Sequence, residues 1–136
     1  MTLAEFYAAR LDEDEAAARA ATPGEWAALD GGVMSVENES WPVSSTESAR
    51  NREDRVHIAR HDPARVLREV EAKRKILAAY EEAAEHPFDL PEGVHDGRDQ
   101  WERERDAAVL AELDGVVRYL AEVDSDHPDY QQAWRP

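Results

Sequence analysis

The chain changes its apolar spacing at Pro23 and Gly24, and this change limits the folds that it can adopt. Before the break, Thr2 and Glu5 form a capping-box pattern ahead of apolar residues at helical spacing. The apolar positions expected to face the core are Leu3, Phe6, Tyr7 and Leu11. Proline cannot continue a helix and glycine permits a sharp turn. The sequence therefore predicts a helix over residues 1–22 and a different structure beyond it.

Residues 25–45 carry short strand-like runs separated by turn residues. The runs EWAAL, VMSVE and WPVSS lack helical periodicity, and the LDGG and ENES segments between them are typical of turns. Pro42 has no amide hydrogen to donate, which places the last run at the edge of a sheet. A sheet this small needs a helix packed on one face. We therefore expect a two- or three-stranded antiparallel meander.

A pair of helices is predicted over residues 47–85, the first starting between Thr46 and Ala49. Asp62 is a typical N-cap for the second helix, and Pro63 fits its first position because that amide hydrogen would be unused. The apolar residues expected to face the core from this second helix are Val66, Leu67, Val70, Ile76, Leu77 and Tyr80.

Two prolines and two glycines indicate a loop over residues 86–99, which precedes a helix over residues 100–124 and a tail over residues 125–136. In the helix, we expect an apolar seam at 4-3-4-3 spacing to face the core, with Trp101, Leu110 and Val117 flanking it. The residues of the seam are Val109, Leu113, Val116, Leu120 and Val123. The predicted fold class is α+β, with three or four helices and a small antiparallel meander inserted between the first and second. We expect residues 1–136 to form a single domain.

Composition excludes several chemistries. The chain has no cysteine, so disulfides, thiolate nucleophiles and cysteine-ligated metal sites are absent. Its net charge of −15 disfavours direct contact with nucleic acid and anionic membranes. Between residues 49 and 75, however, nine basic residues stand against five acidic ones, and we expect Arg52, Arg55, Arg60 and Arg68 to be neutralised internally. Without a long apolar segment or a signal pattern, a cytoplasmic protein is expected.

Three histidines are candidates for binding a metal or another ligand. His57 and His61 are four residues apart, so their imidazoles share one helix face, and His127 could add a third donor. The glutamate that zinc-protease helices place after the first histidine is replaced by Ile58. The alternative is that these histidines are structural or solvated, and we expect no cofactor and no bound metal. The carboxylates of residues 12–15 could hold magnesium, but a solvated face is the favoured interpretation.

Four further residues are candidates for binding. Arg65 and Arg68 lie in the first turns of the helix that starts at Pro63, where anions can bind, although Asp62 competes for the same amides. Tyr130 and Trp134 either fold back onto the domain, which we favour, or contact a partner. No pattern identifies a catalytic residue.

Three segments, RLDEDEAAARAATPGEW, HIARHDPARVLREVEAKRKIL and DHPDYQQAWRP, resemble an uncharacterised family of small acidic proteins of actinobacteria and their phages, a domain of unknown function. Family members often carry a loop of cysteines and histidines suited to zinc. The corresponding loop here has no cysteine but has His86, His95, Asp96 and Asp99. The order of PGEW, strands and HIA is also similar to small phage early-region proteins.

These observations predict a non-enzymatic acidic protein that acts by binding another protein, whose identity the sequence does not give. A homo-oligomer is left open. The alternative is a small metal-dependent or nucleotide-binding enzyme that uses His57, His61 and carboxylates.

Overall fold

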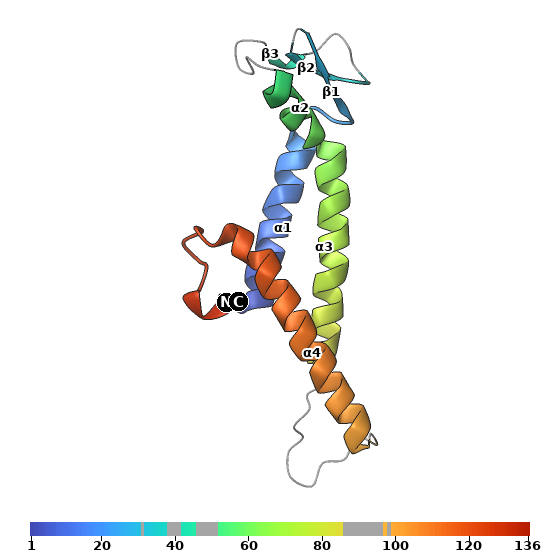
Figure 1. Cartoon of the computed structure of the whole chain (residues 1–136), viewed down its shortest axis with the longest axis vertical. Coiled ribbons are helices and arrows are strands. Elements are labelled where there is room, and N and C mark those ends of the chain that lie inside the picture. The colour runs from blue at the N-terminus through green and yellow to red at the C-terminus, as the bar shows by residue number, and fades with distance from the viewer. Residues whose placement is uncertain (31, 38–41, 46–51, 86–96, 98) are drawn as a thin grey trace. The chain divides into compact units, whose positions relative to one another are not determined.

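The protein is described by a computed structural model in which residues 1–30, 32–37, 42–45, 52–85, 97 and 99–136 are placed (Figure 1). It is an α+β protein, as predicted. The elements follow in the order α1 (Leu3–Ala20), β1 (Trp26–Leu29), β2 (Gly32–Ser35), β3 (Pro42–Ser45), α2 (Arg52–Arg60), α3 (Pro63–Ala84), α4 (Gln100–Ala121) and the short 3-10 helices η1 (Glu122–Asp124) and η2 (Gln132–Trp134).

The chain divides into two compact units. The first comprises Met1–Arg10 and Lys73–Pro136, and the second comprises Leu11–Ala72. Helices α1 and α3 each contribute residues to both units. That the whole chain folds as a single domain stays a prediction.

The capping box at the start of α1 is present as predicted. The Thr2 amide donates to Glu5 Oε2 at 2.6 Å, and the Glu5 amide donates to Thr2 Oγ1 at 3.2 Å. The hydrogen bond from the Thr2 amide to the Glu5 carboxylate, followed by the Thr2 side chain, holds the pKa of Glu5 below its usual value. The helix ends at Ala20, two residues before the predicted end. Gly24 follows with a φ of +86°, a conformation that favours glycine.

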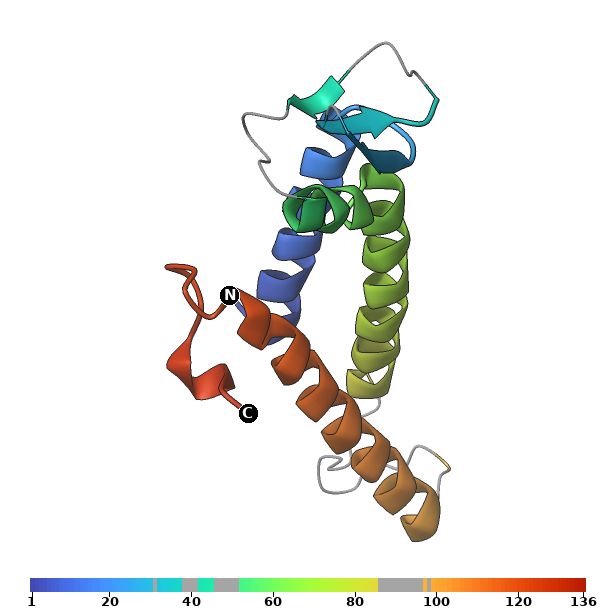
Figure 2. The same cartoon turned by 45° about the horizontal axis from the view of Figure 1, so that its top comes forward.

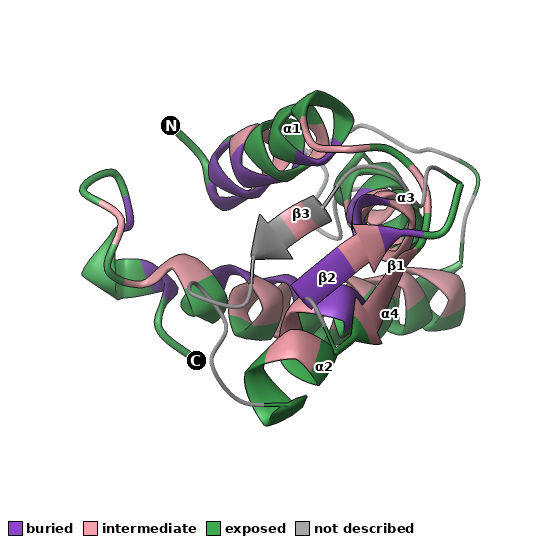
Figure 3. Ribbon diagram, turned by 90° about the horizontal axis from the view of Figure 1, so that it is seen from above, coloured by how far each residue is buried: buried purple, intermediate pink, exposed green. Residues whose placement is uncertain are grey.

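The second unit contains an antiparallel sheet of three strands in the order β1-β2-β3. Pro42 pairs with Met34 next to a register irregularity in the edge strand β3, in agreement with its missing donor. Val33 and Ser35 on β2 are buried (Figure 3). Helix α2 packs on β1 and β2, which gives the small sheet the cover that it needs (Figure 2).

Asp62 joins the sheet to α3 within the second unit. Its Oδ1 accepts from the Arg65 amide at 2.7 Å, so it caps the helix that starts at Pro63, as predicted. Its Oδ2 accepts from the Trp26 amide on β1 at 3.4 Å, a bond that the sequence did not suggest. The predicted start of α2 between Thr46 and Ala49 lies outside the described residues.

The first unit is built on aromatic side chains. Phe6 on α1 is fully buried and contacts the rings of Tyr130 and Trp134, with ring centroids 5.7 and 5.1 Å away. The Tyr130 and Trp134 rings also meet edge to face at 5.8 Å. The C-terminal tail thus folds back onto α1, which is the favoured of the two predicted arrangements.

Candidate functional site

The predicted core seam of α4 is wrong in part. Val117 and Ala121 are fully buried, whereas Val116 is 40% exposed although it stands next to Val117. Val109 and Val123, which were also assigned to the core, are exposed, while Leu113 and Leu120 are half-buried. The helix therefore buries a different side from the one that the 4-3-4-3 spacing selected.

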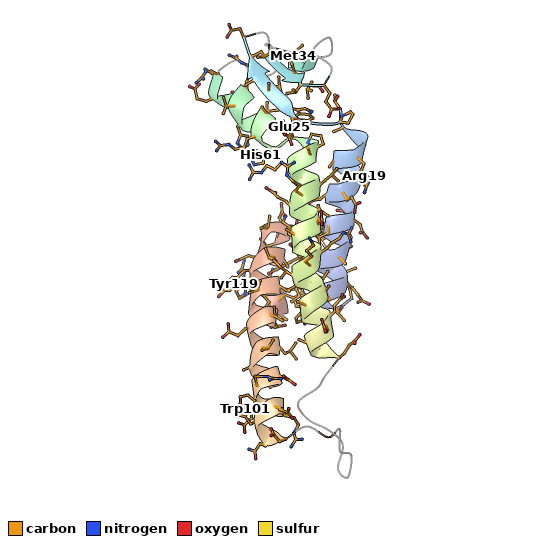
Figure 4. All side chains as sticks on the ribbon, turned by 90° about the vertical axis from the view of Figure 1, so that its right-hand side faces the viewer. Arg19, Glu25, Met34, His61, Trp101 and Tyr119 are labelled. Carbon is orange, nitrogen blue, oxygen red and sulfur yellow. The ribbon has the colours of Figure 1, made fainter. Side chains whose placement is uncertain are left out.

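The exposed side of α4 carries large apolar residues, which we call the outer α4 face: Trp101, Val109, Val116 and Tyr119. Trp101 and Tyr119 are 66% and 65% exposed. Figure 4 places both along the same side of α4. Val123 in η1, the next element along the chain, is exposed as well. Single exposed apolar residues are ordinary, but two large aromatic rings on one helix face are a candidate binding surface.

Small residues hollow out the middle of this face. Ala108, Ala111 and Gly115 line a shallow groove of about 490 Å³ together with Glu112, Val116 and Tyr119. A Cβ atom built on Gly115 would meet nothing within 4 Å, so the space above this glycine is open. Small residues permit a second backbone to approach a helix closely, because ridges of one helix pack into the grooves of another.

Acidic side chains border the groove. Glu104, Glu112 and Glu122 are exposed along or beside the outer α4 face. Arg105 is the nearby cation, and its guanidinium lies 5.4 Å from the Trp101 ring centroid while donating to Asp106 Oδ1 at 2.9 Å. The border of the apolar surface is thus negative overall.

A polar network holds the opposite side of α4 within the first unit. Asp114 accepts from Tyr80 on α3 at 3.3 Å and from Arg118 Nε at 2.6 Å. Arg118 Nη1 in turn donates to the carbonyl of Ala133 at 2.8 Å. Burial, followed by the nearby Asp114 carboxylate, raises the pKa of Tyr80. The network fixes which side of α4 faces α3 and the tail.

The candidate metal ligands are placed as follows. His57 and His61 are exposed on α2 and its end, with ring centroids 4.5 Å apart. His127 belongs to the first unit, where its ring meets Phe6 edge to face at 5.7 Å and its Nδ1 accepts from the Asp129 amide at 3.1 Å. Among the described residues, no three histidine, aspartate or glutamate side chains are grouped to hold a metal. Glu15, in the acidic run, forms an ion pair with Arg19 instead.

Of the two candidate anion ligands, Arg65 is held by contacts within the chain and Arg68 is exposed. The Arg65 guanidinium donates to Glu69 at 2.6 Å and to the Arg60 carbonyl, and Asp62 already accepts from its amide. Arg52, Arg60 and Arg68 form no ion pair with any carboxylate in the part of the chain that the structure describes. Internal neutralisation is therefore not found for these three arginines within that part.

The tail residues that were candidates for contacting a partner are covered. Tyr130 and Trp134 are each 7% exposed and contact Phe6. Among the loop residues that correspond to the family's zinc loop, His86, His95 and Asp96 lie outside the described residues, whereas Asp99 is the N-cap of α4. Its Oδ1 accepts from the Glu102 amide at 2.8 Å.

Sequence reasoning missed the outer α4 face. Two apolar stripes share this helix, and the 4-3-4-3 spacing assigned to the core the stripe that contains Val109 and Val116, which are exposed. The available signal was the glycine at position 115 followed one turn later by Tyr119, because a missing side chain next to a large one leaves the helix surface uneven.

The fold and this surface define a small acidic α+β protein with an exposed apolar helix face. The chain belongs to a family of unknown function, DUF6221, whose family model matches residues 1–136. Neither the curated proteins nor the solved structures contain a match to it. No helix in the described part of the chain is long and apolar enough to cross a membrane.

Proposed function

We propose that this protein is a non-enzymatic interaction module that binds another protein through the outer α4 face. The observation that carries the proposal is the exposure of Trp101 and Tyr119 by about two thirds on one side of a single helix. Aromatic rings at the centre of an interface contribute much of its binding energy because each buries a large apolar area.

The partner that fits this face is an amphipathic helix with basic residues beside its apolar stripe. The shallow groove over Gly115 is lined by residues of α4 alone, and it suits a helical ridge. Glu104, Glu112 and Glu122 favour lysine or arginine around that ridge. A second copy of the chain fits less well, because it would bring the same acidic border and a further net charge of −15.

The actinobacterial and phage origin implied by the resemblance belongs to the same proposal, as does a cytoplasmic location. Small phage early-region proteins with a similar order of segments provide the support for that origin. A basic host protein would then be the partner.

A peptide titration tests the proposed interaction. A fluorescent helical peptide of leucine and lysine should bind at low salt, and its leucine and glutamate counterpart should not. Trp101→Ser and Tyr119→Ser should each weaken binding about tenfold, the effect of a central aromatic contact. Leu29→Ser is the matched control, since Leu29 is 51% exposed but lies on β1.

Circular dichroism should show the same helix content in all variants, because the replaced side chains are exposed. Equal peptide affinity of the wild type and both α4 variants would overturn the proposal. A dimer in sedimentation that Tyr119→Ser dissociates would instead identify a second copy as the occupant of the face.

A further inference from the structure

His57 and His61 lie side by side on the outer surface of the second unit. Both are exposed, and their rings are 4.5 Å apart between centroids with planes inclined by 49°. Imidazoles four residues apart on a helix can direct one nitrogen each at a common point. The exposed position leaves that point open to a solute.

A hydrogen bond to the backbone determines which ring nitrogen of neutral His61 carries the hydrogen. His61 Nδ1 lies 2.9 Å from the carbonyl oxygen of His57. A carbonyl oxygen only accepts, so Nδ1 carries the hydrogen and Nε2 of the neutral ring carries the free lone pair. Metal-binding histidines are commonly oriented in this way, by donating the other ring hydrogen to a carbonyl. The His57 ring nitrogens make no hydrogen bond to any other described residue.

We propose that His57 and His61 together bind one divalent transition-metal ion through their imidazole nitrogens. Two imidazoles suit Cu²⁺, Ni²⁺ and Zn²⁺, whereas Mg²⁺ and Ca²⁺ prefer oxygen ligands. The affinities should follow the general order for nitrogen sites, with Cu²⁺ above Ni²⁺. This site is on α2, so it is independent of the proposed function of α4.

Neighbouring charges tune the site. A shallow hollow of about 300 Å³ on α2 is lined by His57 together with Arg52, Glu53, Val56 and Arg60. The two arginines repel a dication, whereas the Glu53 carboxylate, one turn before His57, attracts it. No third donor is grouped with the pair among the described residues, so water or another molecule completes the coordination. A site with only two protein ligands should hold its ion weakly, so we expect dialysis against a chelator to remove it.

The test is a calorimetric titration of the untagged full chain with CuCl₂, NiCl₂ and MgCl₂. We expect one equivalent of Cu²⁺ or Ni²⁺ to bind, and Mg²⁺ to give no heat of binding. His57→Asn and His61→Asn should each lower the Ni²⁺ affinity by about tenfold or more. His127→Asn is the matched control and should leave it unchanged, whereas Arg60→Gln should raise it because one repelling charge is removed.

An NMR titration locates the ion independently of affinity. Substoichiometric Ni²⁺ should broaden the imidazole signals of His57 and His61 before that of His127. The proposal is overturned if neither Cu²⁺ nor Ni²⁺ binds, if both asparagine variants bind as the wild type does, or if the His127 signal broadens first.

Discussion

Asp62 shows at the scale of one residue how a local rule and a tertiary contact combine. Its sequence context predicted the cap on α3, because aspartate before proline is a typical helix start. The second hydrogen bond, to the Trp26 amide, links residues 36 positions apart, and local pattern carries no information about such a contact. Asp62 as a whole is 8% exposed, so both bonds are partly shielded from water.

Asp62→Ala should therefore lower the free energy of unfolding by about 1–2 kcal/mol, since it removes a cap and a weaker tertiary bond. Asp62→Asn should retain most of the stability, because asparagine caps a helix as well as aspartate does. Urea denaturation followed by circular dichroism measures both. Equal losses in the two variants would show that the negative charge, and not the acceptor geometry, stabilises the helix start.

Tyr80 provides a prediction for alkaline pH. Its pKa in the folded protein is raised by burial and then by Asp114, so folding favours the neutral phenol. The stabilising contribution is complete below the unfolded value of 10.0 and is lost as the pH rises through the folded pKa.

We therefore expect the stability of the wild type relative to Tyr80→Phe to fall between neutral pH and about pH 11. The reason is that the Tyr80 phenol ionises more readily in the unfolded chain than in the folded protein, whereas phenylalanine does not ionise. Urea denaturation at several pH values gives this difference, and ultraviolet titration of the phenols compares the pKa directly. A difference that stays constant over this range would contradict the raised pKa of Tyr80.

At the scale of the element, α4 shows what periodicity can and cannot predict. The helix itself was predicted, but its buried side was not, because Val109 and Val116 repeat as regularly as Leu110 and Val117 do. The choice between the stripes depends on partners that are distant in sequence. Asp114 bonds to Tyr80 on α3, and Arg118 reaches the Ala133 carbonyl in the tail. These polar contacts turn the second stripe inward.

Val116 and Val117 allow this orientation to be tested with the same substitution at adjacent positions. Val117→Ala should lower the free energy of unfolding by about 2 kcal/mol, because Val117 is 0% exposed and truncation leaves a cavity. Val116→Ala should change it by no more than about 0.5 kcal/mol, as at other surface positions. Urea midpoints at equal slope report both values. A larger loss for Val116→Ala would restore the seam predicted from spacing.

The local elements of the fold were largely predictable, whereas the candidate surfaces were not. The capping box of Thr2 and Glu5, the edge position of Pro42 and the cap at Asp62 all follow from rules that act over a few residues. The exposure of Trp101 depends on how the other elements pack against α4, and the amino-acid composition does not predict this packing. The spacing of His57 and His61 predicted that they share a helix face. The hydrogen bond that fixes the tautomer of His61 is seen only in the three-dimensional structure.

At the scale of the whole molecule, the two compact units share two continuous helices. Neither α1 nor α3 is interrupted where it passes from one unit to the other. Unfolding one unit would therefore leave half of each helix without its packing partners, and short helical segments are unstable alone. We infer that the units unfold together, as a single domain does.

Fluorine NMR of protein labelled with 5-fluorotryptophan tests this cooperativity. Trp26 reports on the second unit and Trp134 on the first. Their folded signals should disappear at the same urea concentration, because a two-state transition has one midpoint for all probes. Phenylalanine substitutions assign the signals. Two separate midpoints would show that the units are independent domains.

The double role of Asp62 also has a consequence for the order of folding events. The bond to the Arg65 amide closes within one helical turn, and helix formation takes place within about a microsecond. The bond to the Trp26 amide requires a long segment of chain to close first, which carries a larger entropic cost. We therefore expect the nascent helix to orient the carboxylate before β1 reaches it. The start of α3 would then be formed before the sheet, and the bond to the Trp26 amide would hold β1 against it.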